Sequence, residues 1–135
     1  MKIKPETPSL FLLFNHTLTE VQRTDALNSL RIREFIEPPE QIQQLWSDIP
    51  AEIGSINELL IPVREWLGNM ASADDYVLIQ GDFGACCQMA DYARRLGLLP
   101  IYSTTRREAQ EERLGDGSIR LVHRFRHVRF REYGK

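Results

Sequence analysis

The centre of the chain reads Tyr76-Val77-Leu78-Ile79-Gln80-Gly81-Asp82-Phe83-Gly84, an apolar run of strand length followed directly by a loop with two glycines. A continuous apolar run of this kind is typical of a strand that is covered on both faces. Residues 85–96 are rich in small side chains and are followed by Gly97, as expected for a helix packed closely on a sheet. This segment predicts a strand-loop-helix unit at the middle of an α/β fold.

Three other segments predict strands on either side of this unit. Leu10–Phe14 and Pro100–Ser103 are apolar enough to be interior strands. Ile32–Ile36 is more charged and stops before Pro38 and Pro39, which favours an edge strand. Strands that alternate with helical segments indicate a mostly parallel sheet flanked by helices.

The expected helices lie between these strands. Thr19 and Gln22 form a capping-box pattern, and the helix that follows is expected to bury Val21, Leu27 and Leu30. Residues 42–49 carry apolar side chains at helical spacing and are followed by Pro50. Another helix is expected to begin near residues 55–58 and to be bent by Pro62, because proline inside a helix removes one hydrogen bond.

The C-terminal part predicts a β-hairpin. Residues 106–114 are followed by the turn residues 115–118 and by alternating apolar residues from Ile119 onward. The alternation changes parity between Phe125 and Val128, which predicts a bulge near Arg126 and His127.

Length and composition exclude several classes of protein. The chain has 135 residues, 42% of them apolar, with 17 basic and 19 acidic side chains and a net charge of −2. These values indicate one domain, residues 1–135, and argue against disorder, a membrane span and binding of long nucleic acid by bulk attraction. Residues 1–8 are too polar for a secretory signal, and the neighbouring Cys86 and Cys87 predict no disulfide. We therefore expect a reduced, cytoplasmic protein.

Polar residues follow each of the three interior strands. These segments are Asn15-His16-Thr17, Gly81-Asp82-Phe83-Gly84 and Thr104-Thr105-Arg106-Arg107. In open parallel sheets, ligands bind outside the carboxyl ends of the strands. The three segments are therefore expected to meet along one edge and to form the site.

Each segment has a chemical and a plainer interpretation. Backbone amides of Gly81–Gly84 can bind a phosphate at a helix N-terminus, although the loop alone favours a tight strand-to-helix turn. His16 can transfer protons and Asn15 can orient a hydroxyl, or both can merely end a strand. Residues 104–107 offer hydroxyls and guanidinium groups to a phosphodiester, or form a solvated start of the hairpin.

Residues 119–135 contain six basic residues and one acid, which concentrates positive charge at the C-terminus. Residues 123–131, including Arg129, interleave cations with aromatic rings; this pattern favours a solvated strand, and a base-stacking surface is the alternative. Two histidines four apart on a bulged strand do not predict a metal site. Locally clustered positive charge on an acidic body suits a small anion.

Four blocks of sequence together resemble a family. They are residues 10–19, 76–84, 103–107 and 127–133, and they resemble the small standalone CRISPR-associated proteins of the Csx group, in particular the family numbered twenty. The resemblance implies a Rossmann-like, CARF-like domain that forms a homodimer. It also implies a ring nuclease, an enzyme that linearises the cyclic tetra-adenylate messenger of type III CRISPR antiviral defence, without metal or cofactor.

Within this resemblance, residue chemistry suggests the roles. A ribose 2′-hydroxyl would attack the adjacent phosphodiester, so the protein mainly positions the ring and stabilises charge. We expect His16 to transfer the proton, Asn15 to orient the ribose, and Thr105 with Arg106 to stabilise the phosphorane. Asp82 is the second candidate for the base. The remaining ligand-binding candidates are Gly81, Phe83, Gly84, Thr104, Arg107 and Arg129.

Two other functions fit the same residues. The protein can bind cyclic oligoadenylate without cutting it and so act as a sponge or sensor. A dimeric α/β protein that binds a different nucleotide is the third alternative.

Overall fold

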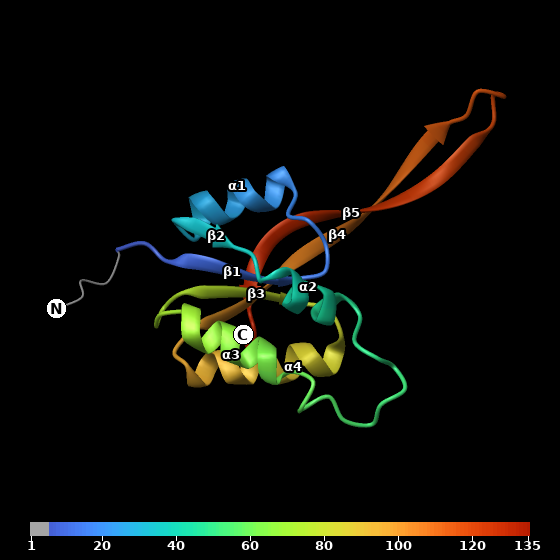
Figure 1. Ribbon diagram of the computed structural model, residues 1–135. Coiled ribbons are helices and arrows are strands. Elements are labelled where there is room, and N and C mark those ends of the chain that lie inside the picture. Colours follow the sequence, from blue (N-terminus) through green and yellow to red (C-terminus); the bar gives the residue numbers. More distant parts are fainter. Residues whose placement is uncertain (1–5) are drawn as a thin grey trace.

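The computed structural model describes residues 6–135. Residues 1–5, part of the segment that is too polar for a secretory signal, lie outside the described residues. Figure 1 shows a sheet with helices on both faces and a long hairpin that leaves the body. The elements in chain order are β1 (Ser9–Phe14), α1 (Glu20–Ser29), β2 (Glu34–Ile36), α2 (Glu40–Ser47), α3 (Ile61–Met70), β3 (Tyr76–Gln80), α4 (Phe83–Arg95), β4 (Leu99–Arg113) and β5 (Ile119–Glu132).

The sheet has the order β2-β1-β3-β4-β5. The first four strands in this order are parallel, and β5 runs antiparallel to β4. This confirms the predicted α/β class, the mostly parallel sheet and the C-terminal antiparallel pair. β2 is an edge strand, as its charged sequence predicts.

The interior strands separate two apolar cores. Residues of α2, α3 and α4 pack on one face of the sheet, around Phe11, Val77 and Ile79. α1 covers the other face, where Leu10, Leu12 and Leu78 are buried. Figure 1 shows the same division, with α1 alone on its side of the sheet. The continuous apolar runs of β1 and β3 follow from this arrangement, because both faces of these strands are covered.

α1 begins where the sequence predicts but turns a different face to the core. Thr19 caps the helix, and the reciprocal bonds between Thr19 and Gln22 complete the capping box. The expected buried stripe is wrong, because Val21 is 54% exposed and Leu27 is 44% exposed. Gln22 and Ala26 face the sheet instead, and Leu30 is partly buried. A polar side chain is accepted there because Gln22 has hydrogen-bond partners.

The expected bend at Pro62 is also wrong. α3 starts at Ile61, so Pro62 lies in the first turn, where its missing amide hydrogen costs nothing. Residues 57–60 form turns that lead into the helix. The buried side chains of α3 are Val63, Trp66 and Leu67.

The third interior strand and the first arm of the hairpin are one element. β4 runs without a break from Leu99 to Arg113, and its second half pairs only with β5. The turn contains Gly117 at φ +86°, a conformation that favours glycine. The register shifts between Thr104, opposite Arg129, and Thr105, opposite His127. Val128 is therefore the extra residue, which confirms the predicted bulge within one position.

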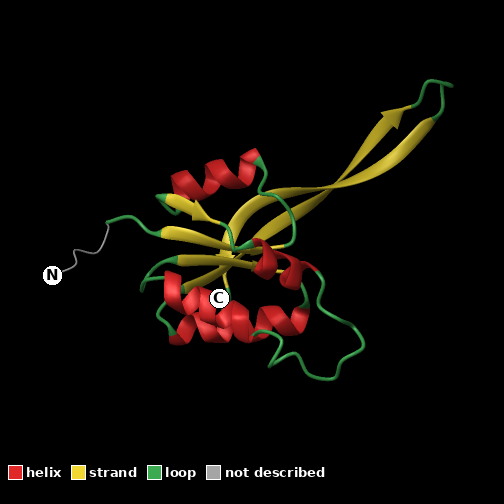
Figure 2. Cartoon of the chain, viewed as in Figure 1, coloured by secondary structure: helices red, strands yellow, loops and turns green. Residues whose placement is uncertain are grey.

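Figure 2 shows the hairpin extending well beyond the helices. Within residues 6–135, no helix combines the length and the hydrophobicity that crossing a bilayer requires. Cys86 is buried, Cys87 is exposed, and both are free thiols.

Candidate functional site at the carboxyl edge of the sheet

The carboxyl ends of β1 and β3 lie together at one edge of the sheet, and β4 passes beside them. Phe14 pairs with Gln80, so Asn15 and Gly81 leave the sheet side by side. The backbone amide of Ser103 donates to Gln80 Oε1 over 2.8 Å, which holds β4 beside the same edge. The ends of β1 and β3, which are far apart in sequence, are thus neighbours, as the sequence analysis predicts. The third segment, residues 104–107, departs from this prediction because β4 continues past the edge into the hairpin.

A pocket of about 290 Å³ opens at the end of β1. Its wall contains Asn15 and His16, both exposed, together with Gln43 of α2. Gln43 Nε2 donates to the Phe14 carbonyl oxygen over 2.9 Å, which fixes the backbone just before the pocket. The His16 ring contacts the edge of the Phe14 ring, with 5.6 Å between the centroids.

Arg23 lines the same pocket and was missed by the sequence analysis. It lies in the second turn of α1, and its guanidinium carbon is 4.5 Å from the centre of the Phe35 ring. The short link between β1 and α1 could have indicated that Arg23 lies at the pocket, because this link brings the start of α1 back over the end of β1. The pocket therefore combines an imidazole, two amides and a guanidinium group with the carboxylate of Glu37.

The loop after β3 has a packing reason for its first glycine. A Cβ at Gly81 would lie 2.9 Å from Trp46 Nε1 and 3.2 Å from Trp46 Cε2. Trp46 Nε1 also donates to the Gln80 carbonyl oxygen over 3.0 Å. The close approach of the indole therefore requires glycine here, whether or not a phosphate binds.

Asp82 caps α4. Its carboxylate accepts from the Ala85 amide over 2.9 Å and so lies at the positive end of the helix. A phosphate bound by the amides of residues 81–84 would have to displace this carboxylate or lie against it. The geometry thus favours the turn interpretation of Gly81–Gly84 over a phosphate-binding loop.

We expect Asp82→Ala to lower the free energy of unfolding by about 1 kcal/mol, because the cap is lost. Asp82→Asn retains a good capping side chain, so its free energy of unfolding should fall by only a few tenths of a kcal/mol. Urea unfolding of the two variants measures the difference. Equal losses in both variants would mean that the carboxylate charge, and not capping, stabilises α4.

Phe83, the first residue of α4, is 95% exposed. A large aromatic side chain gains nothing for folding in this position, since it contacts almost nothing. Exposed aromatic rings at a strand edge are platforms on which nucleic-acid bases stack. Phe83 therefore presents its ring to solvent, and it does not line the pocket at the end of β1.

Residues 104–107 do not act as a unit. The Thr104 hydroxyl donates to the Arg129 carbonyl oxygen over 2.9 Å and also accepts from the Arg129 amide, so it stabilises the bulge. Thr105 and Arg106 are successive strand residues and point to opposite faces. The expected pairing of Thr105 and Arg106 at one phosphate is therefore not found within one chain.

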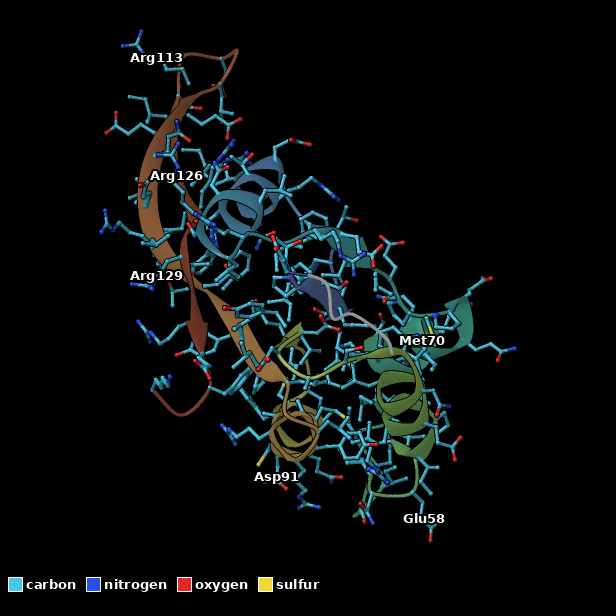
Figure 3. The ribbon with its side chains drawn as sticks, turned by 90° about the vertical axis from the view of Figure 1, so that its left-hand side faces the viewer. Glu58, Met70, Asp91, Arg113, Arg126 and Arg129 are labelled. Carbon is cyan, nitrogen blue, oxygen red and sulfur yellow. The ribbon has the colours of Figure 1, made fainter. Side chains whose placement is uncertain are left out.

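The arginines of this region lie along the hairpin and away from the pocket. Arg106 is opposite Arg126, and Arg107 is opposite Phe125. Arg129 is exposed near the base of the hairpin, where its Nε donates to the Phe130 carbonyl oxygen. Figure 3 shows Arg113, Arg126 and Arg129 spread from the tip of the hairpin to its base.

A buried polar cluster joins α1 to both strands of the hairpin, and the sequence analysis missed it. His127 Nδ1 is 2.5 Å from Ser103 Oγ, and His127 Nε2 is 2.7 Å from Asp25 Oδ2. Gln22 Nε2 donates to Ser103 Oγ over 3.4 Å. The sequence gives no signal for this cluster, because 102 positions separate Asp25 from His127.

The cluster has the residue types of a serine nucleophile with its base, but a substrate cannot reach the serine hydroxyl. Ser103 is 8% exposed, and the His127 side chain is 3% exposed. The hydroxyl is enclosed by Gln22 and His127 and does not line the pocket. We interpret the cluster as the attachment of the hairpin to α1. Within residues 6–135, no three His, Cys, Asp or Glu side chains gather as metal ligands.

The cluster predicts a pH dependence of stability. Burial raises the pKa of Asp25, but hydrogen bonds from Ser29 and His127 and the nearby positive charges outweigh it and lower the pKa below its usual value. A carboxyl whose pKa is lowered by folding stabilises the fold above its unfolded pKa of about 4. This stabilisation is lost as the pH falls through the folded pKa.

We therefore expect Asp25→Asn to cost about 1–2 kcal/mol at pH 7, and less below about pH 4. Urea unfolding at pH 7, 5 and 3 measures the difference. Asp91→Asn is the control, because the Asp91–Arg95 pair is exposed and surface pairs contribute little. A cost for Asp25→Asn that does not change with pH would contradict the expectation.

The comparisons with known proteins agree with one another. Residues 8–131 match the model of the Uncharacterized protein MJ1673 family. The chain belongs to the MJ1673 family. It is 47% identical over 126 residues to "Uncharacterized protein MJ1673" of Methanocaldococcus jannaschii, an alignment that covers 93% of this chain and 97% of that protein. No solved structure matches the chain.

The match to the MJ1673 family spans β1 to the end of the hairpin and includes nearly all of β5. The pocket residues, the Asp82 cap and the polar cluster all lie inside the matched range. The hairpin is thus part of the MJ1673-family domain and not an addition to it.

Proposed function

We propose that this protein is a ring nuclease with a Rossmann-like, CARF-like fold, which binds cyclic tetra-adenylate and linearises it. The pocket at the end of β1 carries the proposal, because Asn15, His16 and Arg23 line it together at the carboxyl edge of a parallel sheet. Proton transfer, hydroxyl orientation and phosphate charge are the three tasks that cleavage by a 2′-hydroxyl requires.

In the proposed reaction, the ribose O2′ attacks the adjacent phosphorus while the bond from phosphorus to O5′ breaks. The 2′-hydroxyl loses its proton and O5′ gains one, so the products are a 2′,3′-cyclic phosphate and a 5′-hydroxyl. His16 moves the proton, Asn15 orients the ribose, and Arg23 stabilises the negative charge on the phosphorane. Arg23 takes the place that sequence chemistry gave to Arg106, which lies on the hairpin.

Phe83 supplies the base-recognition element of the proposal. Its ring is exposed beside the edge, where an adenine can stack on it. Asp82 is not assigned as the base, since its carboxylate caps α4. A homodimer would set two such pockets against opposite phosphates of a four-nucleotide ring, matching the symmetry of the ligand.

Incubation with labelled rings of three, four and six adenylates, with and without chelator, tests the proposal. We expect cyclic tetra-adenylate to yield linear products and the rate to be unchanged by chelator. Tight binding without product at enzyme excess would overturn cleavage and support a sponge or sensor. The absence of any shift in melting temperature with all three rings would overturn the proposal altogether.

A further inference from the structure

The outer hairpin, residues 105–126, is a two-stranded ribbon that no other element within residues 6–135 covers. Its strands pair only with each other, and all but one of its residues are exposed. Figure 2 shows it projecting away from the helices. A two-stranded ribbon alone in water is marginally stable, because neither face is buried. A ribbon of this length therefore needs a surface to lie on.

One face of the ribbon carries its large apolar side chains, with Arg107, Glu111 and Arg113 on the paired strand. The register places Ile119, Leu121 and Phe125 on the same side as His127, which turns toward α1. These three side chains are 58%, 59% and 70% exposed. The other face is more strongly charged and carries the Arg120–Glu112 ion pair. Side chains of this size and exposure on one face are typical of an interaction surface.

A receiving surface of matching character lies on the same side of the sheet. Val21 of α1 and Val128 of β5 line a groove of about 540 Å³, and they are 54% and 50% exposed. Glu20 lies at the rim of this groove and is also exposed. A neighbouring groove between α1 and the ribbon contains both Val21 and Phe125, so the apolar surface is continuous.

The distribution of charge selects the partner. Residues 105–126 contain six arginines and four acids, whereas the whole chain has a net charge of −2, so the remainder is acidic. A basic ribbon with an apolar face fits a surface that is acidic and apolar. α1 offers that combination through Glu20, Val21 and Leu27.

We propose that two copies of this chain exchange their ribbons across a two-fold axis. The apolar face of each ribbon lies on α1 and the Val21–Val128 groove of the other copy. Ribbon and groove share one side of the sheet, so each copy gives and receives the same contact, as a two-fold interface requires. The proposed contact forms the homodimer without a ligand, so it is independent of ring cleavage.

Sedimentation velocity of the full chain without nucleotide tests the proposal. We expect a species of twice the 15.7 kDa chain mass at micromolar concentration. Phe125→Glu should weaken the dimer by about 30-fold or more, because it places a charge in the buried apolar centre. Val21→Glu should do the same from the opposite side of the contact. Circular dichroism tests whether both variants are folded.

Val122→Glu is the matched control. It adds the same charge three positions from Phe125 but on the other face of the ribbon. We expect this variant to remain dimeric. Equal weakening by Val122→Glu and Phe125→Glu would overturn the assignment of the face.

A cross-linking experiment identifies the contact itself. In a Cys87→Ser background, copies with Val21→Cys are mixed with copies with Leu121→Cys and oxidised. We expect a disulfide between the two kinds of chain. A monomer at all concentrations up to about 100 µM, or a dimer that yields no cross-link and resists both glutamates, would overturn the proposal. Binding of a labelled RNA or DNA oligonucleotide by a monomeric chain, lost in Phe125→Glu, would overturn it in favour of a nucleic-acid surface.

Discussion

His16→Ala should lower the rate of cyclic tetra-adenylate cleavage by about 100- to 10,000-fold, which is the usual contribution of a general acid or base. The affinity for the ring should change by less than about 10-fold, since Asn15, Arg23 and Phe83 remain. Single-turnover cleavage at enzyme excess measures the rate, and binding is measured separately by titration. Because His16 is exposed, the substitution should leave the free energy of unfolding nearly unchanged.

Asn69→Ala is the surface control for this experiment. Asn69 is also exposed, but it lies on α3 and does not line the pocket. We expect this variant to cleave at the wild-type rate. Asp82→Asn should also remain active, because it retains the cap. Full activity of His16→Ala together with loss of activity in Asp82→Asn would transfer the role of the base to Asp82.

Trp46→Ala should lower the free energy of unfolding by about 3–5 kcal/mol, the largest stability change predicted for this protein. Trp46 is 2% exposed, and its ring packs against Gly81 at the site edge. The substitution leaves a cavity and deprives the Gln80 carbonyl oxygen of its donor. The melting temperature should fall by roughly 10–20 °C.

Two variants divide this effect into its parts. Trp46→Phe keeps most of the volume but removes the N–H donor, so it should cost about 1–2 kcal/mol. Ile53→Ala is the surface control, since Ile53 is 45% exposed, and it should cost less than about 0.5 kcal/mol. A cost of Trp46→Ala no greater than that of Trp46→Phe would contradict the packing role.

Local patterns were enough to predict most of the elements of this fold. The apolar runs of β1 and β3 predicted interior strands, because a strand covered on both faces needs no polar positions. The capping box at Thr19 and the bulge near His127 are also local signals, since each depends on residues a few positions apart. The ends of β1 and β3 could be placed at one edge once the sheet was taken as parallel.

Contacts between distant residues decided what these patterns left open. Polarity alone did not show that α1 buries Gln22 and exposes Val21, because the partner of Gln22 is Ser103. Arg23 joined the pocket through the packing of α1, and Asp82 proved to be a cap once its bond to the Ala85 amide was seen. Arg106 lies outside the site because β4 continues past the sheet edge into the ribbon. Hydrophobic periodicity reports which side of an element is buried, whereas hydrogen-bond partners and the reach of a strand depend on residues that only folding brings together.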